Sequence, residues 1–144
     1  MGDVGKILEV KGSDVVRIDG ESTVIDAVRT MVDANVGAIL VTGADGRIEG
    51  IFTERDYLRR VAVEGRDQRE TAVSEVMTRE VIVVTPDTSV EEAMALMTDR
   101  RIRHAPVVVD GELLGLISIG DLVKLQSQQQ DYKIRYLTEY ISAG

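Results

Sequence analysis

One short pattern occurs twice in the chain, as GIFTERD at residues 50–56 and as GLISIGD at residues 115–121. Each copy has a glycine, two apolar residues, a hydroxyl residue and, three positions later, an aspartate. The flanking sequence repeats as well, because EVKGSDVVRI at 9–18 aligns with EVMTREVIVV at 75–84, 66 residues later (75 − 9). An internal repeat constrains the fold strongly, since each copy is expected to form the same supersecondary unit.

Two copies of one unit fill most of the 144-residue chain. We predict repeats over 8–66 and 74–127, followed by a C-terminal tail over 128–144. In each repeat, β-branched runs predict strands, apolar residues at helical spacing predict a helix, and an Asp-Gly pair predicts a hairpin turn. The predicted strands are 15–18, 38–41, 48–52, 81–84, 105–109 and 113–117. A helix should follow the first strand of each copy, and another should start at Thr53 and at Ser118.

The expected fold class is therefore α/β (α+β), with the order strand, helix, strand, strand, helix occurring twice. A unit of roughly 60 residues buries little core on its own. We therefore expect the two pseudo-symmetric repeats to pack through their sheets.

Composition excludes several classes of function. Cysteine is absent, which excludes thiol catalysis, disulfides and thiolate metal sites. The formal net charge of −8 makes nucleic acid and anionic lipid poor default partners, because an acidic surface repels phosphate at long range. No apolar run reaches the roughly 18 residues of a membrane span, and no secretory signal is evident. We expect a cytoplasmic protein whose partners include neither nucleic acid nor membrane.

The repeated hydroxyl and aspartate have two interpretations. A Ser or Thr followed three residues later by an acid resembles a helix-capping box, and the pattern recurs at 23–26 and 89–92. The second interpretation rests on position, because Thr53 and Ser118 would lie where a strand ends and a helix begins. Such a helix end suits a phosphate, and a nearby aspartate can accept hydrogen bonds from two ribose hydroxyls. The residues alone leave both interpretations open.

Two longer stretches extend the pattern: MTREVIVVTPDTSVEEAMALM at 77–97 and IRHAPVVVDGELLG at 102–115. Together with GIFTERDYL and GLISIGDLV, they make the chain resemble a stand-alone tandem CBS-domain protein, also called a Bateman module. The resemblance covers about residues 8–127. It implies two β-α-β-β-α repeats and a regulatory module that binds an adenine nucleotide (AMP, ADP, ATP or NAD-type) in clefts between the repeats.

The resemblance also implies site residues. In the family, the hydroxyl–x–x–Asp element contacts ribose through the aspartate and phosphate or ribose through the hydroxyl. Residues just before the first strand and at the second strand line the pocket. The positions that carry over are Thr53, Asp56, Ser118 and Asp121, then Lys11, Gly12, Met77 and Thr78, then Gly37, Ala38, Arg103, His104, Ala105 and Pro106.

The two sites should differ, because the first copy has neither proline nor a basic residue at its second strand. The cleft that receives Arg103 and His104 is the better phosphate site, since a guanidinium offers a charged fork of donors. Whether that cleft uses Asp56 or Asp121 stays open. His104 is the single histidine, and it is either an ordinary hydrogen-bonded residue or a phosphate contact. It has no companion ligands in the sequence, so we predict no metal site.

The tail combines a polar stretch, QSQQQ at 126–130, with DYKIRYLTEYISAG at 131–144. Tyr132, Tyr136 and Tyr140 recur every four residues, which is typical of an amphipathic helix that packs on a partner. The family commonly forms homodimers through helix faces. We therefore predict a homodimer with a C-terminal helix that has a role in it.

The first functional hypothesis is a regulatory nucleotide sensor that signals to a separate effector protein. The sequence has no GxxxxGK[ST] loop and no nucleophile–His–acid set, so we predict no enzyme, no catalytic residue and no catalytic cofactor. The alternative is a structural dimerisation scaffold with degenerate nucleotide sites. In that case Thr53 and Ser118 act only as helix caps.

Overall fold

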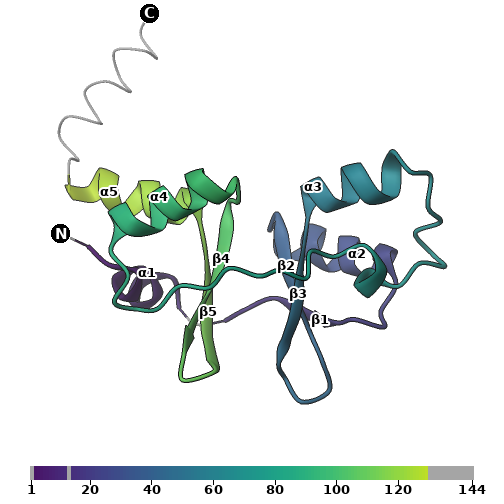
Figure 1. The fold of residues 1–144 in the computed structure, drawn as a ribbon, viewed down its shortest axis with the longest axis horizontal. Coiled ribbons are helices and arrows are strands. Elements are labelled where there is room, and N and C mark those ends of the chain that lie inside the picture. The colour runs from purple at the N-terminus through teal and green to yellow at the C-terminus, as the bar shows by residue number, and fades with distance from the viewer. Residues whose placement is uncertain (1, 13, 130–144) are drawn as a thin grey trace, which may run out of the picture. The chain divides into compact units, whose positions relative to one another are not determined.

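The computed structural model describes residues 2–12 and 14–129, and its elements are labelled in Figure 1. The described residues divide into two compact units. The middle unit is Asp14–Val81, and the terminal unit combines residues 2–12 with residues 82–129. The tyrosine-rich helix predicted in the tail lies outside the described residues.

The middle unit is built around a three-stranded sheet in the order β1-β2-β3. Its elements are β1 (Arg17–Asp19), α2 (Val24–Ala34), β2 (Ala38–Thr42), β3 (Ile48–Thr53), α3 (Glu54–Asp56), the π-helix η1 (Tyr57–Ala62) and the 3-10 helix η2 (Val73–Glu75). Strand β2 pairs in parallel with β1 and antiparallel with β3. Phe52 and Ile39 are fully buried between this sheet and α2, which presents Val24, Ala27 and Met31.

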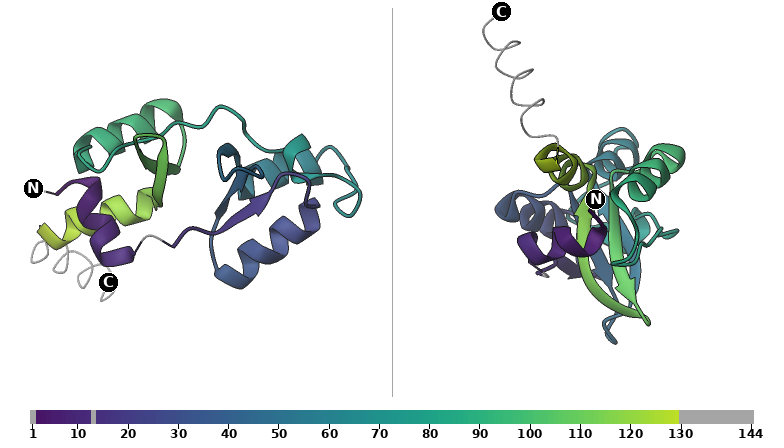
Figure 2. Two further views of the ribbon diagram at one scale, coloured as in Figure 1. Left: turned by 90° about the horizontal axis from the view of Figure 1, so that it is seen from below. Right: turned by 90° about the vertical axis from the view of Figure 1, so that its left-hand side faces the viewer.

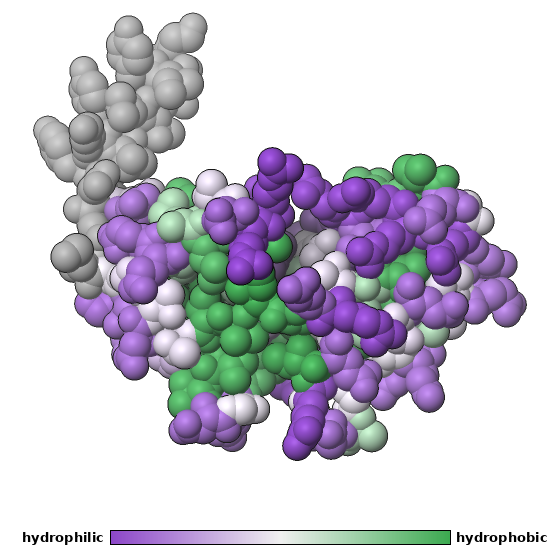
Figure 3. Space-filling view, viewed as in Figure 1, coloured by the Kyte–Doolittle hydropathy of each residue, from purple (hydrophilic) through white to green (hydrophobic). Residues whose placement is uncertain are grey.

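The terminal unit is built around the antiparallel pair β4–β5. Its elements are α1 (Val4–Lys11), α4 (Val90–Arg100), β4 (His104–Val109), β5 (Glu112–Ser118) and α5 (Ile119–Gln129). Helices α1 and α5 contact each other within this unit, and the left view of Figure 2 draws them next to each other. Figure 3 shows apolar side chains gathered over β4 and β5, where Leu113, Leu114 and Leu116 are only half-buried. The mixed α/β fold class predicted from the sequence is confirmed.

The strand predicted at 81–84 is wrong, because this segment makes only one bridge, from Val84 to Val107 of β4. Val84 donates to the Pro106 carbonyl at 2.9 Å and accepts from Val108 at 2.9 Å. The next bonds of a parallel ladder would need an N–H from Pro106 on one side and from Pro86 on the other, and proline has none. In the middle unit, Leu40 stands where Pro106 stands, and its N–H reaches the Val16 carbonyl at 3.2 Å. Strand β1 forms there.

The sequence patterns did not predict the helices that precede each repeat, α1 and η2. Helix α1 buries Val4 and Ile7 in the core of the terminal unit, although it precedes the first repeat in the chain. Helix η2 precedes the second repeat, yet Val73 and Val76 lie in the core of the middle unit. We call residues 4–12 and 73–78 the lead-in segments. Each lead-in segment packs on the repeat that it does not precede.

The glycine that opens each repeated motif makes room for a lead-in segment. A Cβ atom on Gly50 would lie 2.7 Å from the Thr78 carbonyl oxygen and 2.6 Å from the Met77 sulfur. A Cβ on Gly115 would lie 2.5 Å from a methyl carbon of Leu8. Glycine therefore gives the lead-in segment room at both strands, against backbone at Gly50 and against a flexible side chain at Gly115.

Within the residues that the structure describes, no helix is long and apolar enough to cross a membrane.

Candidate functional site

In the middle unit, the hydroxyl–x–x–Asp element forms a reciprocal helix cap. Strand β3 ends at Thr53, and the Asp56 backbone N–H donates to Thr53 Oγ1 at 3.2 Å. Asp56 Oδ2 accepts in return from the Thr53 N–H at 3.0 Å and from Thr53 Oγ1 at 3.2 Å. The capping-box interpretation of this pair is confirmed. The caps predicted at Thr23 and Ser89 are also present.

The second oxygen of Asp56 is held by a lead-in segment. Thr78 Oγ1 donates to Asp56 Oδ1 at 3.0 Å, and the Arg60 guanidinium lies 4.0 Å from the same oxygen. Arg60 also donates to the Met77 carbonyl at 2.7 Å, which fixes the segment that carries Thr78. Asp56 is 7% exposed. It is therefore a buried carboxylate whose two oxygens are both hydrogen-bonded within the unit.

In the terminal unit, the corresponding cap is joined by a cation. Asp121 Oδ2 accepts from the Ser118 N–H at 2.8 Å, and Ser118 Oγ accepts from the Asp121 N–H at 3.1 Å. Lys11 Nζ, from the other lead-in segment, lies 2.7 Å from Asp121 Oδ2 and donates to the Leu116 carbonyl at 2.9 Å. The Asp121 side chain is 24% exposed, so this carboxylate is more accessible than Asp56.

The electrostatic surroundings lower the pKa of Asp121. Partial burial on its own raises the pKa, because it disfavours the charged form. The hydrogen bond from Lys11, the hydrogen bonds from Ser118 and the charge of Lys11 outweigh that effect. The net result is a pKa below the ordinary value of an aspartate.

This direction predicts a pH dependence of stability. A carboxyl group with a lowered pKa in the folded state stabilises the fold above its unfolded pKa, and the contribution is lost as the pH falls through the folded pKa. We expect the wild type to exceed Asp121→Asn in free energy of unfolding by about 1 kcal/mol at pH 7, a modest value for a partly exposed ion pair. Urea unfolding of both proteins between pH 7 and pH 3 should show this difference shrinking at acid pH. A difference independent of pH would contradict the assignment.

The structure brings Arg103 and His104 to the Ser118 end of the terminal unit. His104 lies opposite Ser118 in the β4–β5 ladder, and the Ile119 N–H donates to the Arg103 carbonyl at 2.8 Å. Arg103 is exposed and His104 is half-buried. Within the terminal unit, the start of β4 and Asp121 therefore lie at the same end of the β4–β5 pair. Ala105 and Pro106 follow along β4, and both residues are buried.

The matching positions of the middle unit, Gly37 and Ala38, carry no charge. Ala38 lies opposite Thr53 in the β2–β3 ladder, and the Glu54 N–H donates to the Gly37 carbonyl at 3.1 Å. The Glu54 carboxylate occupies the space that a side chain on Gly37 would fill. Sequence reasoning missed Glu54, although GIFTERD has an acid where GLISIGD has Ile119. Glu54 therefore adds negative charge at the strand end with Asp56, where Arg60 also lies 4.0 Å from the carboxylate, whereas Arg103 adds positive charge at the strand end with Asp121.

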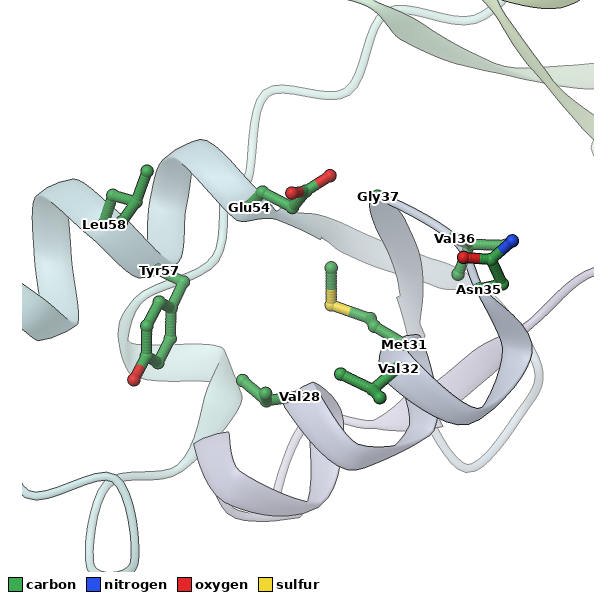
Figure 4. Close-up of a pocket in the computed structure, with 9 residues that line it drawn as sticks. All are labelled: Val28, Met31, Val32, Asn35, Val36, Gly37, Glu54, Tyr57 and Leu58. Carbon is green, nitrogen blue, oxygen red and sulfur yellow. The ribbon is translucent and has the colours of Figure 1, made fainter.

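A groove of about 500 Å³ on the middle unit borders the hydroxyl–x–x–Asp element, because Glu54 of that element helps to line it. Its lining residues, drawn in Figure 4, are Val28, Met31, Val32, Asn35, Val36, Gly37, Glu54, Tyr57 and Leu58. Side chains from α2 and from the η1 segment face each other across it. Val32 is 71% exposed and Leu58 is 59% exposed, so the groove presents apolar surface to solvent. Of the predicted site residues it includes Gly37 alone.

Comparisons with known proteins agree on one family. The CBS domain model matches residues 7–63 and 73–128. The chain is 45% identical over 128 residues to the mitochondrial CBS domain-containing protein CBSX3 of Arabidopsis thaliana. This match covers 86% of the chain but only 62% of that protein. It is 33% identical to YhcV of Bacillus subtilis over 127 residues, or 88% and 89% of the two chains. A solved structure, a putative signal-transduction protein with CBS domains from Burkholderia ambifaria, has a TM-score of 0.85 and 44% identity, covering 89% and 96%.

Proposed function

Because the chain belongs to the CBS-domain family, we propose that it is a sensor that binds an adenine nucleotide at Asp121 and signals to a separate protein. CBS-domain proteins are generally regulatory, non-catalytic modules, and CBS domains generally bind adenine nucleotides. The identity of the nucleotide (AMP, ATP or NAD), the homodimer and the cytoplasmic location stay predictions. The effector protein is unknown.

The strand end of the terminal unit is the single observation that carries the proposal. It combines an accessible carboxylate on Asp121, a hydroxyl on Ser118 and the N-terminus of α5. The carboxylate suits ribose hydroxyls, and the helix terminus suits a phosphate. Arg103 adds positive charge that the middle unit lacks at the same position, where Gly37 stands. We therefore assign the primary site to Asp121 and a weaker or vacant one to Asp56.

Ligand-dependent stability tests this assignment. At ten times its dissociation constant, a nucleotide that binds only the folded protein should raise the free energy of unfolding by about 1.4 kcal/mol. We expect AMP, ATP or NAD to produce this rise in the wild type and in Asp56→Asn, but not in Asp121→Asn. Asparagine can still accept from the Ser118 N–H, so the cap should survive the change. Urea titrations with and without each nucleotide give the measurement. An unchanged rise in Asp121→Asn would remove this carboxylate from the site.

The groove on the middle unit favours a second candidate, a scaffold that associates with another copy of itself. Val32 and Leu58 are apolar, exposed and line the same groove, and apolar surface gathered in one place favours an interface. The same titrations separate the two functions, because a scaffold would form a dimer by sedimentation and show no rise with any adenylate. A wild type that binds nucleotide and also dimerises would keep the sensor as the primary function.

A further inference from the structure

The two candidate carboxylates are held by lead-in segments of different chemistry. Asp56 accepts from the neutral hydroxyl of Thr78, whereas Asp121 accepts from the ammonium group of Lys11. The two contacts have the same structural role, because each joins a lead-in segment to the aspartate of a hydroxyl–x–x–Asp element. Only the contact at Asp121 is an ion pair formed by a lead-in segment. The proposed primary site is therefore already engaged by a charged group of its own chain.

We propose that Lys11 is an intramolecular latch: it competes with the bound nucleotide for Asp121, so that binding frees the C-terminal turn of α1. The proposal rests on the function proposed above and adds a mechanism by which occupancy changes the surface of the protein. The freed turn is then the feature that a partner protein could detect.

Competition follows from the hydrogen bonds that Asp121 already makes. A pair of neighbouring ribose hydroxyls binds a carboxylate best when each hydroxyl donates to a different oxygen. Asp121 Oδ2 already accepts from Lys11 at 2.7 Å and from the Ser118 N–H at 2.8 Å. The Ser118 bond belongs to the helix cap, so Lys11 is the donor that a ribose hydroxyl would replace.

Helix α1 is anchored at its start and exposed at its end, so release of Lys11 would be local. The first turn is fixed by the Val4 N–H to the Thr88 carbonyl and the Gly5 N–H to the Pro86 carbonyl, both at 2.9 Å. Val4 is fully buried. At the other end, Val10 is 77% exposed and Lys11 makes the side-chain bonds to β5 and α5. Leu8 still packs on the core, so losing those bonds loosens the last turn without detaching it, while the first turn stays docked.

Comparing Lys11→Met with Lys6→Met tests the latch. Lys6 is an exposed lysine on the same helix, so its replacement makes the same change in net charge without touching Asp121. We expect calorimetry to show AMP binding about threefold more tightly to Lys11→Met than to Lys6→Met, the scale of a partly exposed ion pair. Hydrogen exchange should show that AMP accelerates exchange at residues 8–12 of the wild type and leaves residues 4–7 unchanged.

Each remaining outcome decides the question. Weaker or equal AMP binding by Lys11→Met would overturn the latch, and weaker binding would make Lys11 a phosphate contact instead. Slower exchange at residues 8–12 on AMP binding would also overturn it, because Lys11 would then close over the ligand. Failure of the wild type to bind AMP, ATP or NAD would end the proposed function, and the latch with it. Nucleotide binding by the wild type without faster hydrogen exchange at residues 8–12 would overturn the latch and leave the proposed function standing.

Discussion

Replacing Asp56 with alanine is expected to lower the free energy of unfolding by about 3 kcal/mol, whereas Asp121→Ala should lower it by about 1 kcal/mol. The two aspartates occupy the same place in the repeated motif, so sequence similarity alone would predict equal costs. The structure makes them different. Asp56 is 7% exposed, while the Asp121 side chain is 24% exposed and paired with a lysine that can turn to water.

The cost at Asp56 comes from the partners that would be left behind. The Thr53 N–H and the Thr78 hydroxyl both donate to Asp56, and neither has another recorded acceptor in the described part of the chain. A part-buried donor without an acceptor costs about 1–3 kcal/mol, and Asp56→Ala leaves two such donors. The cap bond from the backbone N–H of residue 56 to Thr53 Oγ1 survives the change, so it adds nothing to the loss. At Asp121, the freed Lys11 regains its solvation in water, which offsets most of the loss.

Urea unfolding monitored by circular dichroism measures both changes. Asp56→Asn is the matched control, because an amide oxygen can still accept from the Thr53 N–H and should recover most of the stability. Equal losses for Asp56→Ala and Asp121→Ala would show that burial of the first carboxylate does not matter. Failure of Asp56→Asn to recover stability would show that the negative charge, rather than hydrogen bonding, holds the lead-in segment.

The repeated sequence predicted the elements inside each repeat because their signals are local. Alternation of apolar residues, Asp-Gly turns and Ser or Thr caps all act within a few positions, and the structure has β2, β3, β4 and β5 where these patterns placed them. The strand predicted at 81–84 failed for a reason also present in the sequence, since Pro86 and Pro106 remove the two N–H groups that would extend its single bridge. Local β-propensity was outweighed by missing N–H donors in the segment itself and in the partner strand.

The exchange of lead-in segments could not be predicted from the repeat. Two copies of a sequence show which segments are equivalent, but not on which copy each segment packs. The contact of Lys11 with Asp121 joins residues 110 positions apart, and nothing local distinguishes it from a contact of Lys11 with Asp56. The candidate carboxylates were therefore found from the motif, while the groups that hold them came only from the structure.

Replacing the glycines of the motif is expected to have the second large effect on stability. The added Cβ clashes with backbone at Gly50 but only with a side chain at Gly115. We expect Gly50→Ala to lower the free energy of unfolding by about 3 kcal/mol, at the upper end for overpacking, and Gly115→Ala by about 1 kcal/mol. A Cβ on Gly50 would strike the Thr78 carbonyl oxygen, which can withdraw only by giving up the bond that it accepts from the Ile51 N–H at 2.9 Å. A Cβ on Gly115 would meet only the end of the Leu8 side chain, which can change rotamer.

Gly120→Ala is the control for these two variants, because it lies in α5 and an added Cβ would meet only Ser118 Oγ at 3.5 Å. This change should stabilise the protein by about 0.5–1 kcal/mol, since alanine favours a helix over glycine. In Gly50→Ala the lead-in segment must move away from β3, so the bond from Thr78 to Asp56 should break as well. Hydrogen exchange at the Thr78 amide, which donates to the Ile51 carbonyl at 2.8 Å, reports that movement directly. Equal costs for Gly50→Ala and Gly115→Ala, with the Thr78 amide still protected, would contradict a lead-in segment held against the strand by its backbone.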